Sequence, residues 1–115
     1  MNNDDVDQAF QALQNALQSA QLMFMDLRDA GNTADAANAK LRADRIQNEV
    51  DNLTNKQLAD WQAGARALIP QLTNAAKAAQ TAITDVENDI KDAQKVQSAM
   101  QTLDQVISIA MKFVG

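Results

Sequence analysis

The stretch VDQAFQALQNALQSAQLMFMDL, residues 6–27, decides the fold of this chain. Its apolar residues recur at alternating spacings of four and three, which places them on one face of a helix and is typical of coiled-coil packing. The residues of this seam are Val6, Phe10, Leu13, Leu17, Ala20, Phe24 and Leu27. The spacing predicts a first helix over residues 4–30, about 40 Å long at 1.5 Å per residue.

The following stretch, DAGNTAD, predicts the end of this helix and the start of another. Gly31 can adopt the left-handed conformation that often follows the last helical turn. Thr33 can accept a hydrogen bond from a backbone N–H group, so we expect it to cap the second helix. At the other end, the acidic residues 4, 5 and 7 suit a helix N-terminus because the helix dipole favours negative charge there.

A second apolar seam covers residues 39–53. Its members are Ala39, Ala43, Ile46, Val50 and Leu53. The next apolar residue of the pattern then follows after five residues instead of three or four. The seam resumes at Leu58 and continues at helical spacing to Val114. Trp61 belongs to this seam, so we expect it to pack in the core. At this irregular spacing, Thr54 and Gln57 stand three residues apart, as in a capping box at the start of a helix. Thr84 and Glu87 have the same spacing.

Gly64 and Pro70 mark a hinge or turn in this second half. A proline inside a helix removes one hydrogen bond and costs about 3 kcal/mol, but it is well tolerated in the first turn of a helix. A tight turn near residues 68–70 and a kink in a continuous helix therefore both fit the sequence.

Two architectures follow from these patterns. One has three helices over residues 4–30, 33–68 and 70–114, and the other has four helices with breaks at Thr54 and Thr84. Both are all-α, antiparallel up-and-down bundles with short loops and coiled-coil-like seams. We expect residues 1–115 to form a single domain of this kind, because the chain contains no linker and no internal repeat.

The composition excludes several kinds of chemistry. The chain has no His and no Cys, so Ser-His-Asp and Cys-His catalytic sites, disulfides and ordinary zinc sites cannot form. Its three glycines form no phosphate-binding loop. The net charge of −5 and the scattered Lys and Arg residues argue against nucleic-acid binding. We therefore expect no enzymatic activity, no cofactor, no metal and no small-molecule substrate.

The best cluster of carboxylates is in the stretch DVENDIKD. Asp85, Asp89 and Asp92 share one helix face there, but Ile90 and Val96 stand where a calcium loop needs Gly and Glu. We interpret the cluster as a solvated face.

The start of the sequence, MNNDDVDQAF, lacks the basic and apolar regions of a signal peptide. The longest uncharged run, from Gln8 to Met25, contains too many Gln residues to span a membrane. We expect a cytoplasmic protein, and export without a cleaved signal is compatible with the same sequence.

Two segments are apolar around more than one face of their helices, which is typical of helices buried on several sides or used for contacts. The predicted contact residues are Leu22, Met23, Phe24, Met25, Val106, Ile109 and Phe113. In the three-helix architecture both segments lie at the same end of the bundle. The sequence therefore predicts a non-enzymatic protein that acts through helix-face contacts, either by self-association or by binding a protein partner. The alternative is a membrane-active or exported protein whose segment from Leu103 to Val114 binds a bilayer surface.

Overall fold

The computed structural model describes residues 2–56, 60–61 and 64–114, and its long elements are four helices. They are α1 (Asn3–Asp29), α2 (Thr33–Asn55), α3 (Leu68–Asn88) and α4 (Ala93–Val114), and a 3₁₀ turn, η2 (Ala65–Ala67), precedes α3. The prediction of an all-α bundle is confirmed, and of the two predicted architectures the four-helix one is correct.

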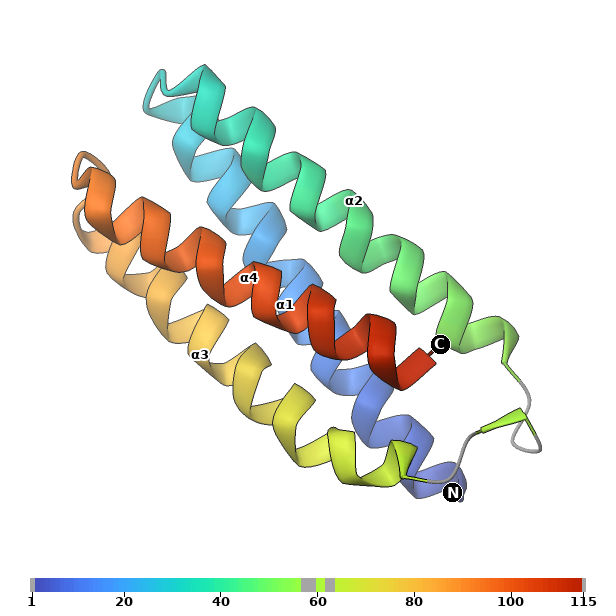
Figure 1. Ribbon diagram of the computed structural model, residues 1–115. Helices are drawn as coiled ribbons and strands as arrows, with labels where there is room; N and C mark the ends of the chain where they lie inside the picture. Colours follow the sequence, from blue (N-terminus) through green and yellow to red (C-terminus); the bar gives the residue numbers. More distant parts are fainter. Residues whose placement is uncertain (1, 57–59, 62–63, 115) are drawn as a thin grey trace.

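The four helices form two antiparallel hairpins that pack side by side (Figure 1). Helix α1 packs on α2 and α3, α4 packs on α3 and α2, and α1 has little contact with α4. The two short turns lie at one end of the bundle, and the end of α2 and the start of α3 lie at the other end, with the start of α1 and the end of α4. In consequence α1 and α3 are neighbours that run in the same direction.

The turn between α1 and α2 shows the predicted role of glycine. Gly31 has a φ of 82°, its N–H donates to the Arg28 carbonyl over 3.0 Å, and Asn32 N–H donates to the Leu27 carbonyl over 2.9 Å. This pair of bonds is the Schellman arrangement that ends many helices. The prediction of a left-handed Gly31 is confirmed.

The caps of the later helices differ from the sequence prediction. Asn32, rather than Thr33, caps α2 by accepting from the Asp35 N–H over 3.3 Å. Helix α4 begins after Asp92, whose Oδ1 accepts from the Gln94 N–H over 3.0 Å. The predicted break at Thr84 is therefore wrong by several residues, because α3 continues to Asn88.

Thr54 and Thr84 both lie in the last turns of their helices instead of starting new ones. Thr54 Oγ1 donates to the Val50 carbonyl over 2.9 Å, and Thr84 Oγ1 donates to the Gln80 carbonyl over 3.0 Å. A threonine hydroxyl that bonds to the carbonyl four residues back is satisfied within a helix and is not available as a cap.

The α2–α3 connection settles the role of Pro70. Helix α2 ends at Asn55, Gly64 has a φ of 91°, and α3 begins at Leu68. Pro70 is thus the third residue of α3, within the first turn, where helix N–H groups have no partner inside the helix. A kinked continuous helix through Pro70 is wrong, and the turn lies before Leu68.

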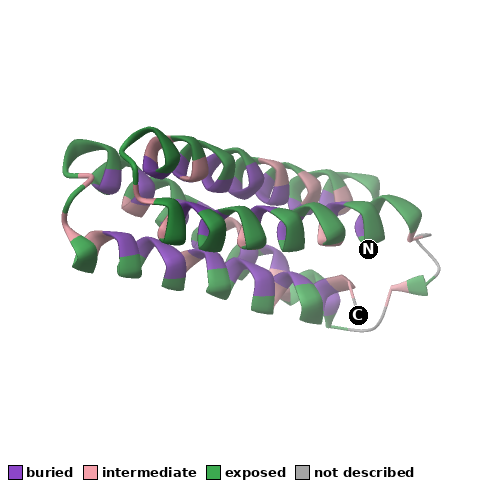
Figure 2. Cartoon of the chain, turned by 90° about the horizontal axis from the view of Figure 1, so that it is seen from above, coloured by how far each residue is buried: buried purple, intermediate pink, exposed green. Residues whose placement is uncertain are grey.

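Each helix buries one face in a common core (Figure 2). The largest fully buried side chains are Leu13, Met23, Leu27, Ile46, Leu53, Leu72, Val86, Leu103, Val106 and Phe113. Many alanines lie between them, and their small side chains let the helices approach closely.

Trp61 packs against the core at the end of the bundle where α4 ends. Its ring centroid lies 4.5 Å from that of Phe113, and the Lys56 ammonium lies 4.9 Å from the Trp61 ring centroid. Lys56 also donates a hydrogen bond to the carbonyl of Val114. The predicted packing role of Trp61 is confirmed, since the residue is half-buried against the core.

Candidate contact surface between α1 and α3

The predicted contact residues divide into buried and exposed groups. Met23, Val106 and Phe113 are buried within this chain, at 0%, 0% and 1% exposure, so they form core rather than surface. The prediction for these three is wrong because α1 and α4 each pack on two neighbours and bury a broad stripe. Leu22 and Met25 are exposed at 48% and 43%, and Phe24 and Ile109 are half-buried.

The two apolar segments also do not meet. In a four-helix bundle, α1 and α4 run in opposite directions, so residues 22–25 lie near the α1–α2 turn and residues 106–114 lie toward the opposite end (Figure 1). A joint surface formed from both segments, as the three-helix architecture implied, is excluded by this topology.

A groove runs instead along the seam between α1 and α3. Two cavities of about 320 and 230 Å³ lie along this seam, and both are lined by Asn15 and Gln80, so they adjoin. The first extends to Gln8 and Thr73, and the second extends to Leu22 and Glu87. The groove follows the two parallel helices for about 21 Å, at 1.5 Å for each of the 14 residues from Gln8 to Leu22.

Two rows of side chains form the walls of the groove. The α1 ridge consists of Gln8, Gln11, Asn15, Gln18, Leu22 and Met25, and the α3 ridge consists of Thr73, Lys77, Gln80, Thr84 and Glu87. Both ridges have alternating spacings of three and four residues, so each forms a straight row along one side of its helix. Together with the groove floor they make up the surface that we call the α1–α3 face.

The floor of the groove is made of mostly small side chains. Ala12 and Ser19 of α1 are 5% and 6% exposed, and Ala76 and Ile83 of α3 are 3% and 2% exposed. Small residues at this seam leave space above them because no long side chain from either helix fills it. The sequence carries the signal for this groove in the spacing of its Gln and Asn residues, which the apolar seams do not include.

Charge is absent from the exposed side of α1 along this groove. All exposed residues from Gln8 to Met25 are uncharged. The exposed residues of α2, by contrast, include Lys40, Asp44, Arg45 and Asp51. Desolvating amide side chains costs less than desolvating ions, so the uncharged face is the cheaper one to cover with another protein.

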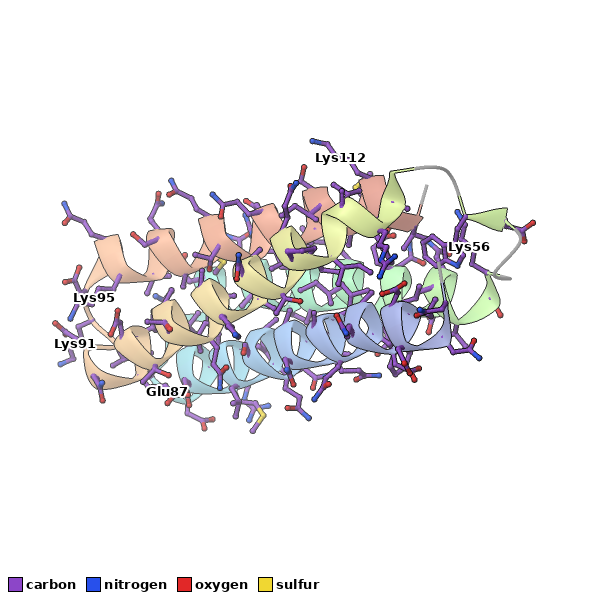
Figure 3. The ribbon with its side chains drawn as sticks, turned by 90° about the horizontal axis from the view of Figure 1, so that it is seen from below. Lys56, Glu87, Lys91, Lys95 and Lys112 are labelled. Atoms are coloured by element: carbon purple, nitrogen blue, oxygen red, sulfur yellow. The ribbon has the colours of Figure 1, made fainter. Side chains whose placement is uncertain are left out.

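One end of the α1–α3 face has two neighbouring carboxyl groups. Glu87 is exposed, but slight burial, followed by the negative charge of Asp26 and a hydrogen bond shared with it, raises the pKa of Glu87 above its ordinary value of 4.5. Figure 3 shows Glu87 on the side of α3 nearest α1. Two carboxyl groups, those of Glu87 and Asp26, therefore lie close together at this end of the groove.

The carboxylates near the α3–α4 turn have structural roles. Asp92 caps α4, and Asp89 forms an ion pair with Lys95 at 3.7 Å. A further cavity of about 290 Å³ is lined by Asp85 and Asp92, with Gln94, Lys95 and Ser98 from α4. Within the described part of the chain, no group of three or more acidic side chains is arranged to hold a metal ion.

The segment from Leu103 to Val114 presents little apolar surface. Its Leu103, Val106 and Phe113 side chains face the core, and Met111 is the large apolar residue that is most exposed, at 59%. Among the residues that the structure describes, no helix has the length and apolar character needed to cross a membrane.

Comparisons of the whole chain with known proteins return no relative. No protein-family model matches it, no curated protein matches its sequence, and no solved structure matches its fold.

Proposed function

We propose that this protein is non-enzymatic and acts by binding another protein chain on its α1–α3 face. The observation that carries the proposal is the groove between the two ridges, along which every exposed residue of α1 from Gln8 to Met25 is uncharged. The lack of His and Cys in the sequence supports a non-enzymatic role.

The shape of the groove suits a helix as the bound element. Side chains of a third helix can pack between two parallel helices whose ridges repeat every three and four residues, as they do in coiled coils. Gln and Asn side chains can both donate and accept hydrogen bonds, so the ridges can pair with polar groups of the bound helix. The exposed Leu22 and Met25 add apolar contact area at one end.

Membrane binding, the second function that the sequence suggested, gains no support from the fold. The apolar residues on which it depended, Leu103, Val106 and Phe113, are buried in the bundle. Presenting them to a bilayer would require α4 to leave its neighbours and expose the core.

Site-specific photocrosslinking tests the proposed contact surface. A photoreactive amino acid is placed at Gln11 or Gln18 on the α1 ridge, and at Gln47 of α2 or Gln101 of α4 as matched controls, because all four are exposed glutamines in helices. In the cells that make the protein, we expect discrete protein adducts from the α1 positions and none from the controls. Adducts of equal yield from all four positions, or no adduct from the α1 positions, would show that the proposal is wrong.

A further inference from the structure

The α1–α3 face has two charged residues with no ion-pair partner in the described part of the chain. Lys77 and Glu87 are the charged residues that line its two cavities, and neither forms an ion pair with another described residue. They are ten residues apart on the α3 ridge, which corresponds to about 15 Å along the helix. The face thus has a cation near its middle and an anion near one end.

We propose that the occupant of the α1–α3 face is a second copy of this chain, bound antiparallel about a two-fold axis. This inference rests on the proposed function, because it names the partner of the same face. In a two-fold interface, if a residue i meets residue j of the other copy, then j also meets i. An axis at the level of Ala82 therefore places Lys77 of each copy opposite Glu87 of the other and forms two equivalent ion pairs.

The same axis brings the α1 ridges into register. Pairing Gln8 with Met25, Gln11 with Leu22 and Asn15 with Gln18 of the second copy centres the α1 ridge between residues 16 and 17. Asn15 and Gln80 both line both cavities, so these two residues lie at the same level of the groove. Along the helix axis, the centre of the α1 ridge lies one and a half residues beyond Asn15, which is about 2.3 Å. The centre of the Lys77–Glu87 pair, Ala82, lies two residues beyond Gln80, which is about 3 Å. The two centres therefore agree to within about 1 Å along the parallel helices.

The charge pattern favours this arrangement over a parallel one. In a parallel two-fold pair, α3 of each copy would lie against α1 of the other, so Lys77 would face the uncharged α1 ridge and Glu87 would face the acidic Asp26 end of α1. In the antiparallel pair, each Lys77 offsets the negative charge at the Glu87 end of the other copy. Complementary charges of this kind fix orientation and register more than they add affinity.

The area of the face suits a weak, concentration-dependent homodimer. The bundle measures 46 × 21 × 17 Å. The ridges of the α1–α3 face extend for about 26 Å along it, so at a width of 17 Å the face covers about 440 Å², roughly half of what each partner buries in an interface of standard size. The α1 ridge from Gln8 to Met25 is uncharged, so the two copies bring like charges on α1 together only beyond its ends, where Asp7 lies opposite Asp26 of the other copy.

Sedimentation velocity and light scattering test the inference. We expect a concentration-dependent dimer of about twice the chain mass of 12.5 kDa. Lys77→Glu and Glu87→Lys should each weaken dimerisation about tenfold or more, because each replaces both ion pairs with like charges. The double variant, with the charges exchanged, should recover most of the affinity. Lys112→Glu makes the same charge change on α4, away from the face (Figure 3), and should leave dimerisation unchanged.

The possible outcomes separate this inference from the proposed function. A dimer that is insensitive to both single charge reversals would show that the antiparallel register is wrong. A chain that stays monomeric, with its α1 adducts containing a different protein, would overturn the second copy as occupant and support the proposed contact face. A monomer without α1 adducts would overturn both. Circular dichroism of each variant shows whether the bundle is intact.

Discussion

Glu87 illustrates how a single side chain on the α1–α3 face can oppose folding at neutral pH. Its pKa is raised by slight burial, by the charge of Asp26 and by a hydrogen bond with Asp26. The folded chain therefore binds this proton more tightly than the unfolded chain does. The stabilisation from the protonated group is complete below pH 4.5 and is lost as the pH rises through the raised pKa.

We predict that Glu87→Gln increases the urea midpoint of unfolding at pH 7, because glutamine has the same shape as the protonated side chain and carries no charge. The difference from the natural chain should shrink as the pH falls below 4.5, where Glu87 is protonated in both states. Asp26→Asn should act in the same direction at pH 7, since it removes the neighbouring charge. Equal midpoints for Glu87→Gln and the natural chain at pH 7 would contradict this account.

At the scale of single helices, the sequence predicted most elements and misplaced some of their caps. The apolar seam of residues 6–27 is α1, and the end of α2 at Asn55 lies one residue from the predicted break at Thr54. The break between α3 and α4 was placed too early because Thr84 and Glu87 have the spacing of a capping box. The same spacing also fits the inside of a helix when the threonine hydroxyl bonds to a carbonyl one turn back.

We predict that Asp92→Ala lowers the free energy of unfolding by about 1 kcal/mol, because Asp92 accepts hydrogen bonds from the first N–H groups of α4. Thr84→Ala should change it by less than about 0.5 kcal/mol, since the residue is exposed within α3 and caps nothing. Urea unfolding followed by circular dichroism measures both values. A larger decrease in the free energy of unfolding for Thr84→Ala than for Asp92→Ala would show that Thr84 is the helix cap, as the sequence predicted.

At the scale of the whole molecule, the topology determines which apolar residues are available for contacts. Four helices in two hairpins place the end of α4 beside α2 and α3, where Phe113 packs against Trp61. Three of the seven predicted contact residues are buried for this reason. The contact surface moves to the α1–α3 face, where Leu22 and Met25 remain exposed.

We predict that Phe113→Ala lowers the free energy of unfolding by about 3 kcal/mol, as expected for a large side chain removed from a packed core. Met111→Ala, two residues away on the exposed side of α4, should change it by less than about 0.5 kcal/mol. Guanidinium unfolding monitored by Trp61 fluorescence compares the two. A small effect of Phe113→Ala would mean that this end of α4 is a free surface, as the sequence alone suggested.

The sequence by itself determined the fold class, the extent of α1 and the left-handed conformation of Gly31. These depend on local physics: the spacing of apolar residues along one helix and the steric freedom of glycine. Only the tertiary structure decided that there are four helices, that α1 lies parallel to α3, and that small residues between them leave a groove. Helical spacing shows that a face is buried but does not show which helix buries it, so the position of the α1–α3 face depended on packing between distant segments.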